Sequence, residues 1–201
     1  MNHIIVEDKL RDTNPVPVVI AFTPNYFIPA STCLYSIFAS LDIEEQMHVI
    51  CLLSEELTDR LKQKIQLIGG ERAQYSFINL QGRLQNIYID AKYTEAASYR
   101  LLLPDLLPEY DKVMYIDCDI IVRNNLVKLY RSVDLGNHYL AAVFEAPMDF
   151  QLGHLKVIGC HPDEYVNSGF LIMNLELMRR DNMVEKFIDA SKADYLEFPD
   201  Q

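Results

Sequence analysis

The 201-residue chain is poor in glycine, has no tryptophan and has no block of basic residues. Its seven glycines form neither G-x-G-x-x-G nor G-x-x-x-x-G-K, which excludes the two common glycine-rich phosphate loops. Acidic residues outnumber basic ones by 29 to 18, for a net charge of −11. That balance disfavours an electrostatic grip on nucleic acid or on an anionic membrane. We therefore expect no nucleic-acid partner, and any bound phosphate must be held by a metal ion, arginine or lysine.

Cysteine spacing and hydrophobic runs exclude further classes of protein. The four cysteines, Cys33, Cys51, Cys118 and Cys160, are too far apart for a zinc knuckle or a redox pair, which favours a reducing, cytoplasmic setting. The longest stretch without charge, residues 13–41, exceeds a bilayer span, but its four prolines would interrupt a spanning helix. The amino terminus lacks a basic stretch leading into an apolar one. We expect neither a transmembrane segment nor a secretion signal.

Short apolar runs alternate with stretches of helical period along the chain. The predicted strands are VPVVIAF, MHVICLL, QYSFINL, KVMYI, YLAAVF and VNSGFLIMNL, with an irregular connection of about 20 residues between the last two. Helices are expected after Pro29, from an N-cap at Ser54 and from an N-cap at Thr94, with Pro104 kinking or shortening the third. Two short helices broken near Asp181 are expected in the tail. The alternation predicts an α/β fold, a Rossmann-like, mainly parallel sheet with helices on both faces, in one domain over residues 1–201.

Polar residues follow or open three of these strands. In open parallel sheets ligands bind at the carboxyl ends of the strands, which directs attention to Thr23-Pro24-Asn25-Tyr26, Asp117-Cys118-Asp119 and Asn167-Ser168-Gly169. Asp117 and Asp119 face the same way in an extended chain and suit one hard divalent cation. Chance alone gives about one D-x-D in such a chain. The D-x-D motif is more informative here because it lies between the apolar runs VMYI and IIV. Buried carboxylates need either a metal or a strong hydrogen-bond network.

Four blocks of the sequence together resemble glycosyltransferase family 8. In chain order they are AFTPNYFIPASTCLYSI, SYRLLLPDLLPEYDKVMYIDCDIIV, EYVNSGFLIMNLELMR and FPDQ, and they cover most of the chain from Val16 onward. Members of the family are retaining enzymes that use a nucleotide sugar, most often UDP-glucose or UDP-galactose, with Mn²⁺. The resemblance implies a fold of the glycosyltransferase A type, Mn²⁺ with Mg²⁺ as the alternative ion, and a UDP-sugar donor. The acceptor would be a glycan or a lipid-linked saccharide, as in lipopolysaccharide or other cell-surface glycan synthesis.

The resemblance also implies roles for individual residues. Asp117 and Asp119 would bind the metal, and Arg100 would contact the diphosphate or the sugar. Asp200 would hold sugar hydroxyls and Gln201 would lie below the anomeric carbon, which makes these two and Arg100 the catalytic candidates. The other donor-binding candidates are Ala21, Thr23, Asn25, Tyr26, Cys118, Glu145, Asn167 and Ser168. On the residues alone, Arg100 fits a solvated helix face equally well, and Tyr26 fits a core position.

The sequence departs from the family at one important place. The family takes its third metal ligand from a histidine in an H-x-x-G-x-x-K-P-W-like block, and this chain has no such block. His154 and His161 lie in the long connection, but nothing in their spacing recommends them as substitutes. We therefore expect a carboxyl-terminal segment to be missing, and with it a place for peripheral membrane contact.

Two other functions stay open at this point. One is an inactive relative that binds a nucleotide sugar without transferring it. The other is a phosphatase of the haloacid dehalogenase type, with Asp117 as nucleophile and Asp119 as general acid. In such phosphatases the D-x-D normally opens the fold, whereas here a long α/β segment precedes it.

Overall fold

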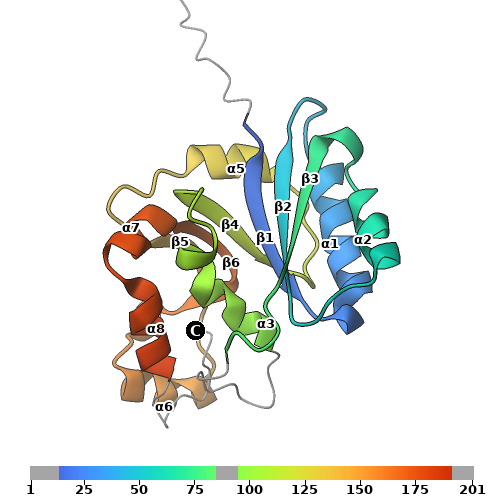
Figure 1. The fold of residues 1–201 in the computed structure, drawn as a ribbon. Helices are drawn as coiled ribbons and strands as arrows, with labels where there is room; N and C mark the ends of the chain where they lie inside the picture. The colour runs from blue at the N-terminus through green and yellow to red at the C-terminus, as the bar shows by residue number, and fades with distance from the viewer. Residues whose placement is uncertain (1–13, 85–94, 192–201) are drawn as a thin grey trace, which may run out of the picture.

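The computed structural model describes residues 14–84 and 95–191, and within them six strands form one sheet (Figure 1). The order across the sheet is β3-β2-β1-β4-β6-β5. The strands are β1 (Val16–Phe22), β2 (Met47–Leu53), β3 (Ala73–Asn79), β4 (Lys112–Asp117), β5 (Leu140–Phe144) and β6 (Val166–Asn174). Each coincides with one of the predicted apolar runs to within two residues, because long β-branched and aromatic runs favour buried strands.

The sheet is mainly parallel, as predicted, with one reversed strand. β1 pairs in parallel with β2 and β4, and β2 pairs in parallel with β3. β6 is antiparallel to both of its neighbours, β4 and β5. Because β6 alone runs backwards, its first residues lie at the edge where β1 and β4 end. This reversal brings Asn167 and Ser168 to the carboxyl edge of the sheet.

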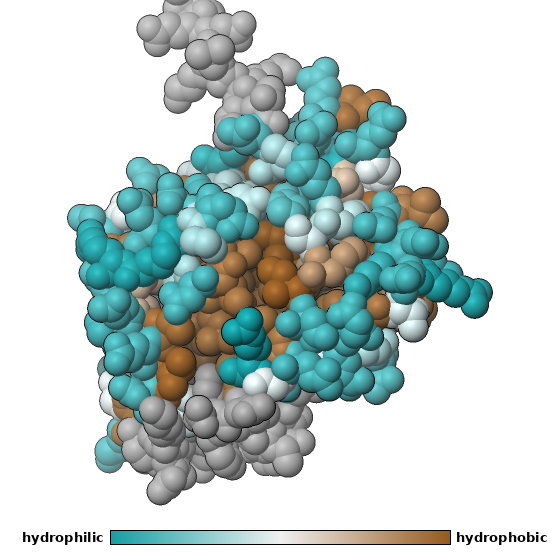
Figure 2. Space-filling view, viewed as in Figure 1, coloured by the Kyte–Doolittle hydropathy of each residue, from teal (hydrophilic) through white to brown (hydrophobic). Residues whose placement is uncertain are grey.

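Helices cover both faces of the sheet, which gives the chain two hydrophobic clusters. One cluster joins the sheet to α1 (Phe27–Ala39), α2 (Asp59–Gln66) and α5 (Leu126–Ser132). The other joins it to α3 (Glu95–Ser98), the 3₁₀ helix η3 (Tyr99–Leu102), α4 (Leu103–Leu106) and α7 (Leu175–Arg180). Alternate residues of each central strand point to opposite clusters, which is why these strands read as unbroken apolar runs. Figure 2 shows apolar side chains in the middle of one face, ringed by hydrophilic ones.

Several predicted helix boundaries are wrong. α1 begins at Phe27, before Pro29, and follows a short 3₁₀ helix, η1 (Pro24–Tyr26). α2 begins after Thr58 instead of after Ser54, and Ser54 is buried in the preceding loop. The third helix is divided into α3, η3 and α4, with Pro104 in the first turn of α4, as its ring requires. Its predicted cap, Thr94, lies outside the described residues.

The connection between β5 and β6 is more regular than expected. It contains α6 (Asp149–Ile158) and the 3₁₀ helix η4 (Pro162–Glu164), whereas an irregular loop was predicted. η2 (Gly70–Arg72) links α2 to β3. The two tail helices, α7 and α8 (Met183–Ser191), are separated near Asp181 as predicted, with Asn182 in the left-handed region at φ 53°. Over residues 14–84 and 95–191, no helix is long and apolar enough to cross a bilayer.

Candidate functional site

The candidate site lies where the ends of β1 and β4 meet the beginning of β6. Asp117 is the last residue of β4, and Ala21 of β1 is its partner in the register. On the other side, Ile116 pairs with Phe170, which places Asp117 beside Gly169. This is the edge drawn at the bottom of Figure 1, where α3 and α6 lie. Three segments far apart in the sequence therefore converge on one carboxylate.

Asp117 is held by two donors. The Nη2 of Arg100 lies 3.2 Å from its Oδ1, and the hydroxyl of Tyr115 donates to the same oxygen at 3.0 Å. Burial raises the pKa of the Tyr115 phenol, so its hydroxyl stays protonated and acts as a donor. The Asp117 side chain is 36% exposed, which leaves part of the carboxylate open to solvent. A hydrogen-bond network, which was one of the two explanations open for a carboxylate here, is therefore present.

Arg100 is buried, so the alternative of a solvated helix face is wrong. It is 3% exposed, and its guanidinium lies 4.5 Å from the centre of the Tyr115 ring. Besides Asp117, it donates to the carbonyl of Ser168 through Nη1 and to the carbonyl of Ala97 through Nε at 2.7 Å. These contacts tie η3 to both β4 and β6. A contact between Arg100 and a diphosphate or sugar stays a prediction.

Gly169 provides the space into which the Asp117 carboxylate fits. A Cβ at this position would lie 2.6 Å from Oδ2 of Asp117 and 3.1 Å from Oδ1 of Asn167. The first distance is shorter than packed atoms allow, and the second is tighter than most contacts between packed atoms. Gly169 is thus required by close approach to the carboxylate, which is one of the recognised uses of glycine in a strand.

Asn167 and Glu145 form a polar pair beside this point. The Nδ2 of Asn167 donates to Oε2 of Glu145 at 3.1 Å, and its Oδ1 accepts from the backbone N–H of Gly169 at 2.9 Å. Asn167 is exposed, whereas Ser168 is buried. The structure thus brings together Arg100, Asp117, Glu145, Asn167 and Ser168.

The Thr23 loop leaves the same edge of the sheet. Thr23 precedes η1, and its carbonyl accepts from the backbone N–H of Tyr26 at 2.9 Å. Asn25 is exposed, and the Tyr26 side chain is 44% exposed. The alternative of Tyr26 as a core residue is therefore wrong, and its ring is accessible for stacking.

The two aspartates were expected to lie between apolar strands, and this expectation is wrong. Asp119 is exposed in a turn, and the run IIV after it forms no strand. Cys118 points into the hydrophobic cluster on the α1 side, and burial raises the pKa of its thiol to about 12. The Cys118 thiol therefore stays protonated and is a poor metal ligand.

Asp117 and Asp119 have the ligand chemistry for a divalent cation, but they are only two side chains. Carboxylate oxygens suit hard ions. Both described hydrogen bonds to the Asp117 side chain end on Oδ1, and Oδ2 lies against Gly169, which has no side chain there. Among the described residues, no group of three or more acidic, histidine or cysteine side chains could hold a metal.

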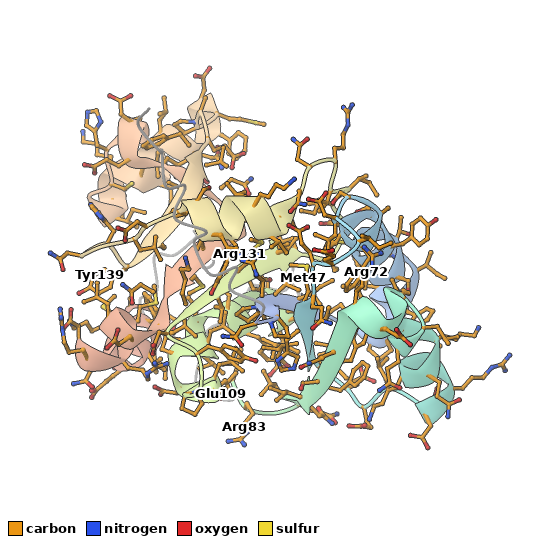
Figure 3. All side chains as sticks on the ribbon, turned by 90° about the horizontal axis from the view of Figure 1, so that it is seen from above. Met47, Arg72, Arg83, Glu109, Arg131 and Tyr139 are labelled. Atoms are coloured by element: carbon orange, nitrogen blue, oxygen red, sulfur yellow. The ribbon has the colours of Figure 1, made fainter. Side chains whose placement is uncertain are left out.

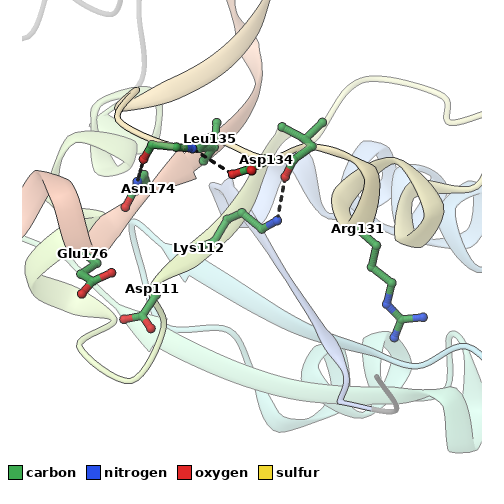
Figure 4. A pocket seen from close by; sticks show the side chains of 9 residues that line it. Asp111, Lys112, Arg131, Asp134, Leu135, Asn174 and Glu176 are labelled. Carbon is green, nitrogen blue, oxygen red and sulfur yellow. Dashed lines mark hydrogen bonds between the residues drawn. The ribbon is translucent and has the colours of Figure 1, made fainter. Parts of the chain in front are cut away.

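Two cavities lie at the opposite edge of the sheet. One, of about 410 Å³, is lined by residues around Lys112 (Figure 4). The Lys112 ammonium donates to the carbonyls of Tyr130 and Val133, each at 3.0 Å. The other, of about 480 Å³, includes His48 and Tyr110. Figure 3 looks onto this edge from above and labels Met47, the first residue of β2. Neither cavity is lined by a residue predicted for the site.

Sequence reasoning missed the roles of two residues of the site and named two that cannot be placed. Tyr115 and Gly169 both contact Asp117, but Tyr115 was not named, and Gly169 was named only as part of the segment that opens the last strand, without a role of its own. Tyr115 is two residues before Asp117 on a strand, and this spacing could have identified it, because such residues share a face. Asp200 and Gln201 lie outside the described residues.

Comparisons with known proteins agree on the fold. General stress protein A of Bacillus subtilis is 24% identical over 199 residues, which are 96% of this chain and 68% of that protein. The structure of the galactosyltransferase LgtC in complex with donor and acceptor sugar analogues has a TM-score of 0.75 at 25% identity, covering 92% of this chain and 68% of LgtC. The bifunctional glycosyltransferase WbbM has a TM-score of 0.74 at 23% identity, covering 96% of this chain.

The chain matches only part of some of these proteins. It spans 36% of WbbM, and about two thirds of general stress protein A and of LgtC. The mixed six-stranded sheet of this chain has the glycosyltransferase A fold of LgtC, as the resemblance implied. The family model named glycosyl transferase family 8 matches residues 17–201, and the chain belongs to that family.

Proposed function

We propose that this chain carries the donor site of a retaining glycosyltransferase that moves a hexose, glucose or galactose, from a UDP-sugar to a glycan acceptor with Mn²⁺. The observation that carries the proposal is the convergence of Arg100, Asp117 and the Glu145–Asn167 pair at the carboxyl edge of the sheet. Ligands bind at this edge in open α/β sheets. The solved LgtC structure, with its donor and acceptor sugar analogues, supports the same class of substrates.

Different residues of the site would bind different parts of the donor. Asp117 and Asp119 would hold the metal, and Tyr26 offers an accessible ring on which uracil can stack. Asn167 and Glu145 present an amide and a carboxylate suited to sugar hydroxyls. A bound Mn²⁺ would supply positive charge against the two phosphates, which a chain of net charge −11 without a glycine-rich loop otherwise lacks.

Arg100 is buried behind Asp117 and supports the site from there. Because its guanidinium is committed to Asp117 and to the carbonyls of Ala97 and Ser168, it fixes the carboxylate and the start of β6 in relation to each other. Pre-set charged groups of this kind need not reorganise when UDP departs.

Family membership decides against the haloacid dehalogenase alternative.

Asp117→Asn and Asp119→Asn are each expected to weaken Mn²⁺-dependent UDP binding by more than about 100-fold, because an amide is a poor ligand for a hard cation. Isothermal titration calorimetry with UDP, with and without Mn²⁺, measures this effect. Asp105→Asn, on the exposed face of α4, is the matched control and should bind as the wild type does. Wild-type protein that binds no UDP at any Mn²⁺ concentration would contradict the proposal.

A panel of UDP-sugars separates an active enzyme from an inactive relative. A transferase is expected to hydrolyse its own donor slowly when no acceptor is present. A relative that only binds should show a thermal shift with UDP and Mn²⁺ but release no UDP from UDP-glucose or UDP-galactose. The sugar that gives both a shift and hydrolysis identifies the donor.

A further inference from the structure

The two oxygens of the Asp117 carboxylate have different surroundings. Oδ1 accepts both described hydrogen bonds, from the Tyr115 hydroxyl at 3.0 Å and from Arg100 at 3.2 Å. Oδ2 lies against Gly169, at a point where a Cβ would be 2.6 Å away. Both described donors therefore contact one oxygen, and the other lies against a residue without a side chain.

Tyr115 is well placed to hold this arrangement. It precedes Asp117 by two residues on β4, so the two side chains share one face of the sheet. Its ring is 1% exposed and lies beneath the Arg100 guanidinium, so the hydroxyl cannot reach a substrate. Any effect of Tyr115 on a ligand must act through Asp117.

The hydroxyl adds something that Arg100 alone does not provide. Arg100 contacts Oδ1 through a single nitrogen, Nη2, because its Nη1 and Nε donate to the carbonyls of Ser168 and Ala97. The Tyr115 hydroxyl projects from the same strand as Asp117 and sits at the end of a rigid, buried ring. A second donor from this fixed position restricts the carboxylate to the orientation in which Oδ1 faces inward.

We propose that Tyr115 is a positioning residue for the divalent cation: with Arg100 it holds Oδ1 of Asp117, so that Oδ2 is the oxygen offered to the metal. This inference rests on the proposed function, because it requires Asp117 to be a metal ligand. Donors behind a ligating carboxylate fix its orientation, and their loss typically weakens metal binding 10- to 100-fold. The alternative is a hydroxyl that only satisfies its own buried polar group and has no effect on a ligand.

Tyr115→Phe separates the two roles, because it removes the hydroxyl and keeps the ring beneath Arg100. Binding of Mn²⁺ alone, and of Mn²⁺ with UDP, is measured by the electron paramagnetic resonance signal of the free ion. We expect the variant to bind Mn²⁺ about 10- to 100-fold more weakly than the wild type. Circular dichroism confirms that the variant is folded.

Tyr130→Phe is the matched control. The Tyr130 hydroxyl donates to the carbonyl of Lys112 at 2.6 Å, so this change also removes a hydrogen bond to β4, but at the other end of the strand. Its Mn²⁺ affinity is expected to equal that of the wild type. An equal loss of affinity in both variants would assign the effect to general destabilisation and overturn the proposal.

A double variant tests whether Tyr115 acts through Asp117. In an Asp117→Asn background, adding Tyr115→Phe is expected to cause no further loss of the residual affinity, because the positioned ligand is already gone. Full wild-type affinity in the single Tyr115→Phe variant overturns the positioning role while leaving the proposed donor site intact. No Mn²⁺ binding by the wild type overturns both.

Discussion

Replacing Gly169 with alanine is expected to weaken Mn²⁺-dependent UDP binding strongly. The added Cβ would lie 2.6 Å from Oδ2 of Asp117 and 3.2 Å from its Cγ, so the carboxylate must move. It cannot move without weakening the hydrogen bonds from Tyr115 and Arg100. We expect UDP affinity in the presence of Mn²⁺ to fall by more than about 100-fold, beyond the range typical of a supporting residue. Titration calorimetry measures it.

Gly153→Ala is the control for this substitution. Gly153 lies within α6, and a Cβ there would meet nothing within 4 Å. Alanine favours a helix over glycine by about 0.5–1 kcal/mol, so this variant should be folded, no less stable than the wild type, and unchanged in UDP binding. Unchanged UDP affinity in Gly169→Ala would show that the Asp117 carboxylate is not used as the structure suggests.

Arg100→Met is expected to give the largest loss of stability of any substitution at the site. It removes the donor to Asp117 and to the carbonyls of Ala97 and Ser168, in a position where the arginine is 3% exposed. Because Asp117 is partly solvated, we expect the lower end of the cost of breaking a buried ion pair, about 3 kcal/mol. For a chain of this size that corresponds to a fall in Tm of about 10 °C.

Thermal unfolding followed by circular dichroism measures this loss. Arg100→Lys should rescue little of it, because an ammonium cannot reproduce the planar fork that reaches three acceptors. Arg180→Met, which removes an exposed arginine paired with Asp181, is the control and should leave Tm unchanged. A wild-type Tm in Arg100→Met would show that the buried guanidinium is not a structural link between β4 and β6.

The strands could be predicted from the sequence, whereas several helix boundaries could not. Continuous apolar runs such as MHVICLL match β2 without error, because buried parallel strands are apolar on both faces. Ser54 is a good helix cap by type, yet the chain continues as a loop to Thr58, since Leu57 is buried in the core. α6 was missed because Gly153 and the polar residues around it obscure its helical period.

The sequence predicted most of the residues of the candidate site, but it did not predict the contacts of Tyr115 and Gly169 with Asp117. The D-x-D motif and the Asn167 segment were predicted from the ends of the strands, and Arg100 was predicted from the resemblance. The structure brings Arg100, Asp117 and Ser168 together. The direction of β6 could not be read from its residues, because an apolar run has the same pattern in either direction. The role of Gly169 follows only from pairing β6 against β4, which decides that it faces Asp117.

The most direct test of this account is a crystal structure with Mn²⁺ and UDP, in which anomalous scattering locates the metal. We expect one strong peak coordinated by Oδ2 of Asp117 and by Asp119, with Oδ1 still receiving hydrogen bonds from Tyr115 and Arg100. The diphosphate should complete the coordination. A metal peak away from Asp117, or one bound to Oδ1 with the Tyr115 hydrogen bond broken, would contradict the account.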